Sequence, residues 1–178
     1  MGKRLFFVVV LVLIGSNCWA QGHCMSFSGT MHLGLRLDLS TGIPIGWVGT
    51  ATVTFGKGTS EIADVAITTT GNKKGIPGTD DKVTMGTETA TFSFQDGGFQ
   101  ILSHFVTEHS DQELAWVNES GTIIPLDKVG RFANASGRYT FHGPFGLAIA
   151  PPGVTPPPGF LDILGCIGEI HGTICSID

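Results

Sequence analysis

The feature that most constrains the fold is a period-two alternation in residues 25–40, MSFSGTMHLGLRLDLS. The odd positions are apolar except Gly29, and the even positions are polar except Gly34. Successive side chains of a strand point to opposite faces, so this pattern predicts a β-strand with one buried face. The run exceeds the usual strand length, and we therefore expect it to bend, with the two glycines as bulge or coiling points.

The alternation predicts further strands along the chain. After a turn at residues 40–44, the stretch 45–55 completes a first hairpin, and β-rich stretches follow at 62–69, 82–94, 99–107, 114–117, 137–141 and 167–177. Turn-forming residues separate these stretches, and no segment has a persuasive helical period. The pattern predicts an all-β fold, a single antiparallel β-barrel of about eight strands, with a β-sandwich as the alternative. Closure would remove exposed sheet edges, which favours the barrel.

The N-terminus is typical of export. Lys3 and Arg4 precede an apolar run of 11 residues at 5–15, and the stretch SNCWA at 16–20 follows, with Ala20 as an acceptable cleavage residue. This run is shorter than a membrane span, so we interpret residues 1–20 as a signal peptide, with a retained anchor as the alternative. Residues 21–178 then form one β-barrel domain of a secreted protein, extracellular or periplasmic.

The charge of the expected mature chain excludes some partners. Without Lys3 and Arg4 it has 8 basic and 15 acidic side chains, a net charge of −7. Nucleic acids and anionic membranes both need a cationic surface, so we expect no nucleic-acid partner and no stable membrane insertion after signal cleavage.

The segment at 151–158 contains five prolines. Proline cannot contribute to a central sheet ladder, so we expect a proline-rich surface loop at 151–158. A recognition segment for an aromatic groove is the alternative.

Cysteine positions predict one disulfide. Cys18 leaves with the signal peptide, and Cys24, Cys166 and Cys175 remain. Cys24 precedes the first strand and Cys175 lies near the end of the last, so antiparallel pairing of these strands would bring them together. Cys166 and Cys175 are separated by extended chain. We therefore predict a Cys24–Cys175 disulfide and a buried Cys166.

A hairpin is predicted at residues 130–143, GRFANASGRYTFHG. The small residues at 133–136 form a turn, and Tyr139 and Phe141 share one face of the strand that follows. The stretch resembles the hairpin of allene oxide cyclases, dirigent proteins and secreted bacterial proteins that share their barrel. The resemblance implies an eight-stranded antiparallel barrel with an apolar cavity, and assembly of identical chains into an oligomer. No catalytic motif of these families matches residue by residue, so their chemistry does not carry over.

Two short polar patterns supply candidate binding residues. Arg138 and His142 lie on one face of their strand, and Glu169 and His171 on one face of theirs. If these faces turn into a cavity, they offer an acid, a base and a cation to a ligand. A solvated outer face is the alternative. Together with Tyr139, the candidate ligand-binding residues are Arg138, Tyr139, His142, Glu169 and His171.

No other motif in the sequence predicts a chemical reaction. The six histidines lack metal-site spacing, and no nucleophile elbow, phosphate loop or dinucleotide fingerprint is present, so we expect no metal and no cofactor and name no catalytic residue. Residues 118–120 and 134–136 fit the glycosylation sequon.

The leading hypothesis is a secreted barrel that binds a small apolar or aromatic ligand. An extension of this hypothesis is that the barrel directs the chemistry of the ligand without a cofactor. A structural or adhesive envelope protein acting through its surface is the alternative, and a cofactor-free cyclase or isomerase is third. The sequence favours a binding protein over an enzyme. A cavity of about 300 Å³ or more with convergent polar groups would separate the first and third hypotheses from the second.

Overall fold

The structure is a computed structural model that describes residues 23–38, 40–42, 44–71, 74–75, 82–109, 114–147 and 160–176. The signal segment at 1–20 and the proline-rich loop at 151–158 lie outside these ranges. Within them the regular elements are β1 (His23–Leu37), β2 (Pro44–Phe55), β3 (Ser60–Thr69), β4 (Lys74–Gly75), β5 (Val83–Phe94), β6 (Gly97–His109), β7 (Leu114–Pro125), β8 (Ser136–Leu147) and β9 (Phe160–Ser176). No described segment is a helix able to span a membrane.

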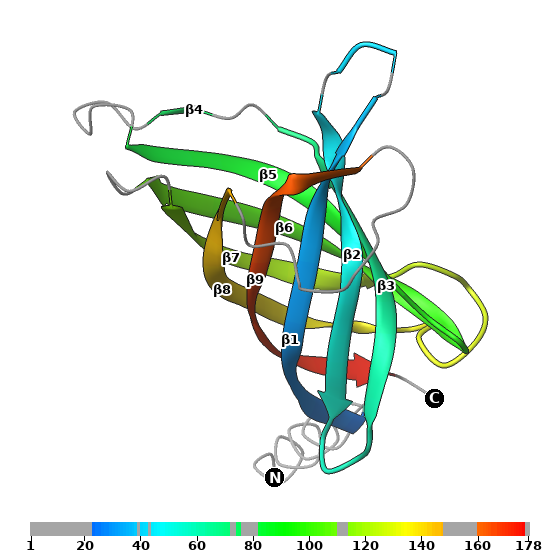
Figure 1. Cartoon of the computed structure of the whole chain (residues 1–178). Coiled ribbons are helices and arrows are strands. Elements are labelled where there is room, and N and C mark those ends of the chain that lie inside the picture. Colours follow the sequence, from blue (N-terminus) through cyan, green and yellow to red (C-terminus); the bar gives the residue numbers. More distant parts are fainter. Residues whose placement is uncertain are drawn as a thin grey trace, which may run out of the picture.

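The described strands form a closed antiparallel barrel of eight strands (Figure 1). Their order is β3-β2-β1-β9-β8-β7-β6-β5, and the pairing of β3 with β5 closes the sheet. The two-residue β4 pairs with Thr84 and Met85 at the start of β5. The first and last long strands, β1 and β9, pair from His23 opposite Ser176 onward. The predicted all-β fold and its barrel closure are confirmed.

Most predicted strands are present, with differences at their ends. The first hairpin is β1 and β2, as expected. The strand predicted at 114–117 continues to Pro125 as β7, because residues 118–125 pair with β6. In β1 the pairing with β9 shifts between Gly34 and Arg36, close to one of the two expected bulge points, whereas Gly29 is paired regularly.

One half of the barrel interior is filled by aromatic rings. Neighbouring ring centroids lie 5.2 to 6.3 Å apart in the phenylalanine cluster, which consists of Phe27, Phe55, Phe92, Phe94, Phe99 and Phe132. An inward-facing glycine makes room for one of these rings. A Cβ atom at Gly172 on β9 would collide with the Phe27 ring. The barrel is therefore tightly packed in the half where β1 starts and β9 ends.

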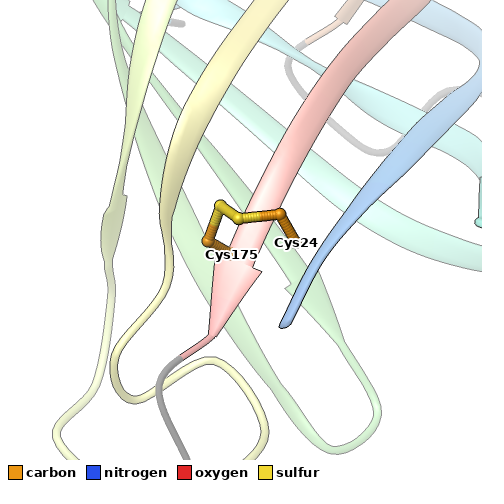
Figure 2. Close-up of a disulfide and its surroundings, with 2 residues drawn as sticks. All are labelled: Cys24 and Cys175. Carbon is orange, nitrogen blue, oxygen red and sulfur yellow. A yellow bond between two sulfur atoms is a disulfide. The ribbon is translucent and has the colours of Figure 1, made fainter. Parts of the chain in front are cut away.

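A disulfide joins the first and last strands in this half. Cys24 on β1 lies directly opposite Cys175 on β9, with a Cα–Cα distance of 4.0 Å, and the two side chains are bonded (Figure 2). Cys166 is a free, buried thiol. The predicted disulfide is confirmed, because antiparallel pairing brings the start of one strand beside the end of the other.

The small-residue stretch before β8 forms the predicted turn, which begins slightly earlier than expected. Residues 131–134 are in turn conformation, and the Ala135 N–H donates a hydrogen bond of 3.0 Å to the Phe132 carbonyl. Arg131 anchors this turn: its Nη1 lies 2.9 and 2.7 Å from the two carboxylate oxygens of Glu61 on β3. Its guanidinium also lies 4.8 Å from the Phe55 ring centroid, so the turn is held against the phenylalanine cluster.

Candidate functional site

The other half of the barrel is hollow and contains a cavity of about 380 Å³. Side chains from both sides of the barrel form its apolar wall: Met31, Leu33 and Leu35 from β1, Ile45 and Trp47 from β2, Ile67 from β3, Phe105 from β6, Val117 from β7, Phe141 and Phe145 from β8, and Cys166 from β9. Trp47 and Phe145 pack edge to face with centroids 5.5 Å apart. Such a wall suits the apolar body of a small molecule.

Two buried acids face this cavity. Glu88 on β5 is 8 % exposed and Glu119 on β7 is 5 % exposed, and both line the cavity. Each occupies an inward position of its strand, two residues from another inward side chain, Ala90 or Val117. The strand period therefore carries both carboxyl groups into the barrel, where a charged group needs compensation. We call Glu88 and Glu119 the acid pair.

Burial raises the proton affinity of Glu119. The pKa of Glu119 is raised above its usual value, first because burial disfavours the charged carboxylate. Interactions with Ser103, Glu88 and Tyr139 oppose this rise without cancelling it. Glu119 therefore holds its proton to a higher pH than an exposed glutamate does.

One oxygen of Glu119 lacks a partner. Its Oε1 atom is buried and has no hydrogen-bond partner among the described residues, and the same is true of the Tyr139 hydroxyl. The hydroxyl is close enough to Glu119 to influence its pKa, but their geometry does not make a hydrogen bond. A buried polar atom without a partner costs about 1–3 kcal/mol, so this arrangement needs an explanation.

The acid pair also affects two neighbouring groups. Burial, followed by the negative charges of Glu119 and Glu88, raises the pKa of the Tyr139 hydroxyl well above its usual value. The same causes raise the pKa of the Cys166 thiol to about 12. At neutral pH both groups are uncharged, and Cys166 is an inert thiol rather than a nucleophile.

No basic side chain is found among the described residues that line the cavity. His109 lies nearby, with its ring edge-on to Phe145 and the centroids 6.5 Å apart, but it does not line the cavity. The described lining residues therefore provide no cation to Glu119, and burial in this low-dielectric wall disfavours its charged form.

Of the five residues that the sequence suggested for ligand binding, one lies inside the barrel and four lie on its outer face. Tyr139 is 1 % exposed and lies in the barrel interior, although it is not among the residues that line the cavity. Arg138 and His142, its neighbours on β8, are exposed on the outer face. Glu169 and His171 on β9 are exposed as well. The structure therefore does not bring these four side chains to Tyr139 or into the cavity.

On the outer face, three of these residues make local contacts. His142 Nδ1 lies 2.7 Å from Asn118 Oδ1, and its ring stacks on Trp116 with centroids 5.1 Å apart. His171 Nε2 lies 3.4 Å from Glu169 Oε2. These are contacts of a solvated polar face, the alternative that the sequence left open.

Sequence reasoning missed the acid pair, although a signal was present. Glu119 lies in the sequon at 118–120, and that motif drew attention to Asn118 on the opposite face of the strand. Both acids interrupt an inward series of apolar or small residues, which an alternation count along β5 and β7 shows. An acid in the apolar phase of a barrel strand is the pattern that identifies the site.

Comparison with known proteins adds no family to these observations. No family model, curated protein or solved structure matches the chain. In the part of the chain that the structure describes, no three His, Cys, Asp or Glu side chains are arranged to hold a metal ion. The site is therefore defined by its own geometry.

Proposed function

We propose that this protein binds a small apolar or aromatic molecule in the hollow half of the barrel. The observation that carries the proposal is a cavity of about 380 Å³ with an apolar wall and two buried carboxyl groups. Small-molecule sites typically combine a largely apolar cavity of about 300–1,000 Å³ with a few well-placed polar groups. The combination supports a binding barrel over a protein that acts only through its surface.

The disulfide supports a location outside the cytosol. Bonds such as Cys24–Cys175 persist in oxidising compartments, including the extracellular space and the bacterial periplasm. The phenylalanine cluster supports a preformed site, because a packed half holds the strands of the hollow half in place. Binding then requires little rearrangement of the barrel.

The test is to fill the cavity and compare with the same change outside the barrel. Leu33→Trp adds an indole to the cavity wall, whereas Leu102→Trp adds one on the exposed outer face of β6. A neutral apolar fluorophore, N-phenyl-1-naphthylamine, is titrated into each folded variant. We expect affinity to fall at least about tenfold in Leu33→Trp and to be unchanged in Leu102→Trp.

Absence of saturable binding to the wild type, or equal affinity of both variants, would refute the proposal. If Leu33→Trp does not fold, Val117→Phe provides a smaller change at the same wall. Native mass spectrometry of the exported protein gives independent evidence, since a molecule retained in the cavity would add a discrete mass.

Proton transfer on the bound molecule is the second candidate function. It is favoured by the position of Glu119, a buried acid that lines the cavity and has a raised pKa and an oxygen without a hydrogen-bond partner among the described residues. Glu119→Gln preserves the size of the side chain and removes its acid. A variant that retains a captured molecule but no longer isomerises it would support this function, and equal conversion by both proteins would exclude Glu119.

A further inference from the structure

The described residues that line the cavity include acids but no basic side chain. Glu88 and Glu119 are acids, and the described lining contains no Lys, Arg or His. The other titratable groups that face Glu119 are Tyr139 on β8 and Cys166 on β9, and neither can supply a positive charge. The described groups around Glu119 therefore offer proton donors and negative charge but no counter-ion.

Glu119 lacks a cationic partner among the described residues. Its side chain is nine-tenths buried and lines the cavity, and its Oε1 atom has no hydrogen-bond partner among the described residues. A carboxylate in such a place is strongly destabilised unless a cation with N–H donors pairs with it. A ligand that carries this cation would provide the missing interaction.

The wall suits an organic cation as well as an apolar body. The rings of Trp47, Phe105, Phe141 and Phe145 line the same cavity. Aromatic faces attract ammonium groups and also pack well against aromatic or alkyl groups. The cavity volume of about 380 Å³ is near the lower end for small-molecule sites, which favours a compact amine of one or two rings.

We propose that the ligand of the barrel is a small aromatic or aliphatic amine whose protonated nitrogen binds the acid pair while its apolar body packs against the aromatic wall. This inference rests on the proposed binding function and specifies its ligand class. An anionic ligand would bring a further negative charge to the two acids. A neutral ligand of the same shape would gain the apolar contacts but not the ion pair.

Binding of the amine is coupled to protonation. When the cation binds, Glu119 gives its proton to water and the ammonium N–H groups take its place, so charge and protons balance. Below the raised pKa of Glu119, affinity for the cation should rise with pH, by up to about tenfold per unit. Affinity for a neutral analogue should not rise in this way.

The experiment compares three probes of nearly equal size: 2-(1-naphthyl)ethylamine, 2-(1-naphthyl)ethanol and 1-naphthylacetate. Each is titrated into the full wild-type protein, Glu119→Gln and the control Glu169→Gln, which changes an exposed acid on the outer face. In the wild type at pH 7.5 we expect the amine to bind at least tenfold more tightly than the alcohol, and the acetate most weakly. Glu119→Gln should abolish the preference for the amine, and Glu169→Gln should retain it.

The outcomes separate the two proposals. Equal binding of amine and alcohol, or a preference that survives in folded Glu119→Gln, would overturn the amine assignment and leave the binding function intact. Failure of all three probes and of the neutral fluorophore would overturn the binding function itself. If Glu119→Gln does not fold, the wild-type pH profile decides, because a flat profile for the amine contradicts the ion pair.

Discussion

At the residue scale, the most informative position is Tyr139. Its ring is buried and packs edge-on against Phe92, with centroids 6.0 Å apart, whereas its hydroxyl has no hydrogen-bond partner among the described residues. The ring therefore stabilises the barrel, and the hydroxyl costs desolvation free energy.

Tyr139→Phe separates these two contributions. We expect the variant to be as stable as the wild type or more stable by about 1 kcal/mol, because it removes an unpartnered buried hydroxyl. Urea unfolding monitored by circular dichroism measures the difference. A loss above about 1 kcal/mol would mean that the hydroxyl is hydrogen-bonded, and loss of ligand binding in a stable variant would give the hydroxyl a chemical role.

Glu119 should make the stability of the barrel depend on pH. Its pKa in the folded protein lies above the reference value of 4.5, so its contribution favours the folded state most at low pH. That contribution is lost as pH rises through the folded-state pKa. The free energy of unfolding of the wild type relative to Glu119→Gln should therefore fall as pH rises from about 4.5. Unfolding curves of both proteins between pH 4 and 8 test this, and a constant difference would contradict a buried acid at this position.

At the element scale, the alternation of single strands was enough to predict the barrel. In β1 the inward series Met31, Leu33 and Leu35 is buried, as the period of two requires. The convergence of the two acids could not be predicted in the same way, because Glu88 and Glu119 lie on strands separated by β6. Their convergence depends on register: Ser103 on β6 pairs with Glu88 on one side and with Gly121 on the other. Ser103 thus lies on the strand between the two acids, and an isolated strand pattern contains no information about that pairing.

The turn before β8 gives a prediction for a single element. Arg131 interacts with Glu61 and with aromatic rings of the phenylalanine cluster, but its side chain is about one third exposed, which weakens the ion pair. Arg131→Ala should lower stability by about 1–2 kcal/mol, from a partly screened ion pair and a cation–π contact.

Arg138→Ala is the matched control for this turn, because Arg138 is exposed on the neighbouring strand. It should change stability by less than about 0.5 kcal/mol. Thermal or urea unfolding of the two variants provides the comparison. Equal effects would show that the contacts of Arg131 do not stabilise the turn.

At the scale of the whole molecule, the barrel divides into a packed half and a hollow half. The phenylalanine cluster and the disulfide lie in the first, and the cavity with the acid pair lies in the second. This separation places the stabilising interactions away from the buried acids and the apolar wall of the cavity. It also explains how a domain of this size tolerates two buried acids.

The disulfide should contribute to global stability, because it closes a loop with a sequence separation of 151 residues. Loop entropy predicts a loss of about 5 kcal/mol when Cys24 and Cys175 are both replaced by serine, since the unfolded chain then gains freedom. Cys166→Ala, which removes a buried thiol outside the bridge, should cost much less. Urea unfolding gives the values, and non-reducing peptide mapping should recover a peptide pair that contains Cys24 and Cys175. Free thiols at both Cys24 and Cys175 would contradict this.

The same bond makes the backbone between Cys24 and Cys175 a covalent ring. A single peptide cleavage within a ring does not divide it. Cleavage after Lys57, in the exposed turn between β2 and β3, would create a new pair of ends while all eight barrel strands remain one molecule until the bridge is reduced. The barrel should therefore form from a chain that begins at a different point of this ring. A circularly permuted chain that starts at Gly58, with the present termini joined, should form the same sheet.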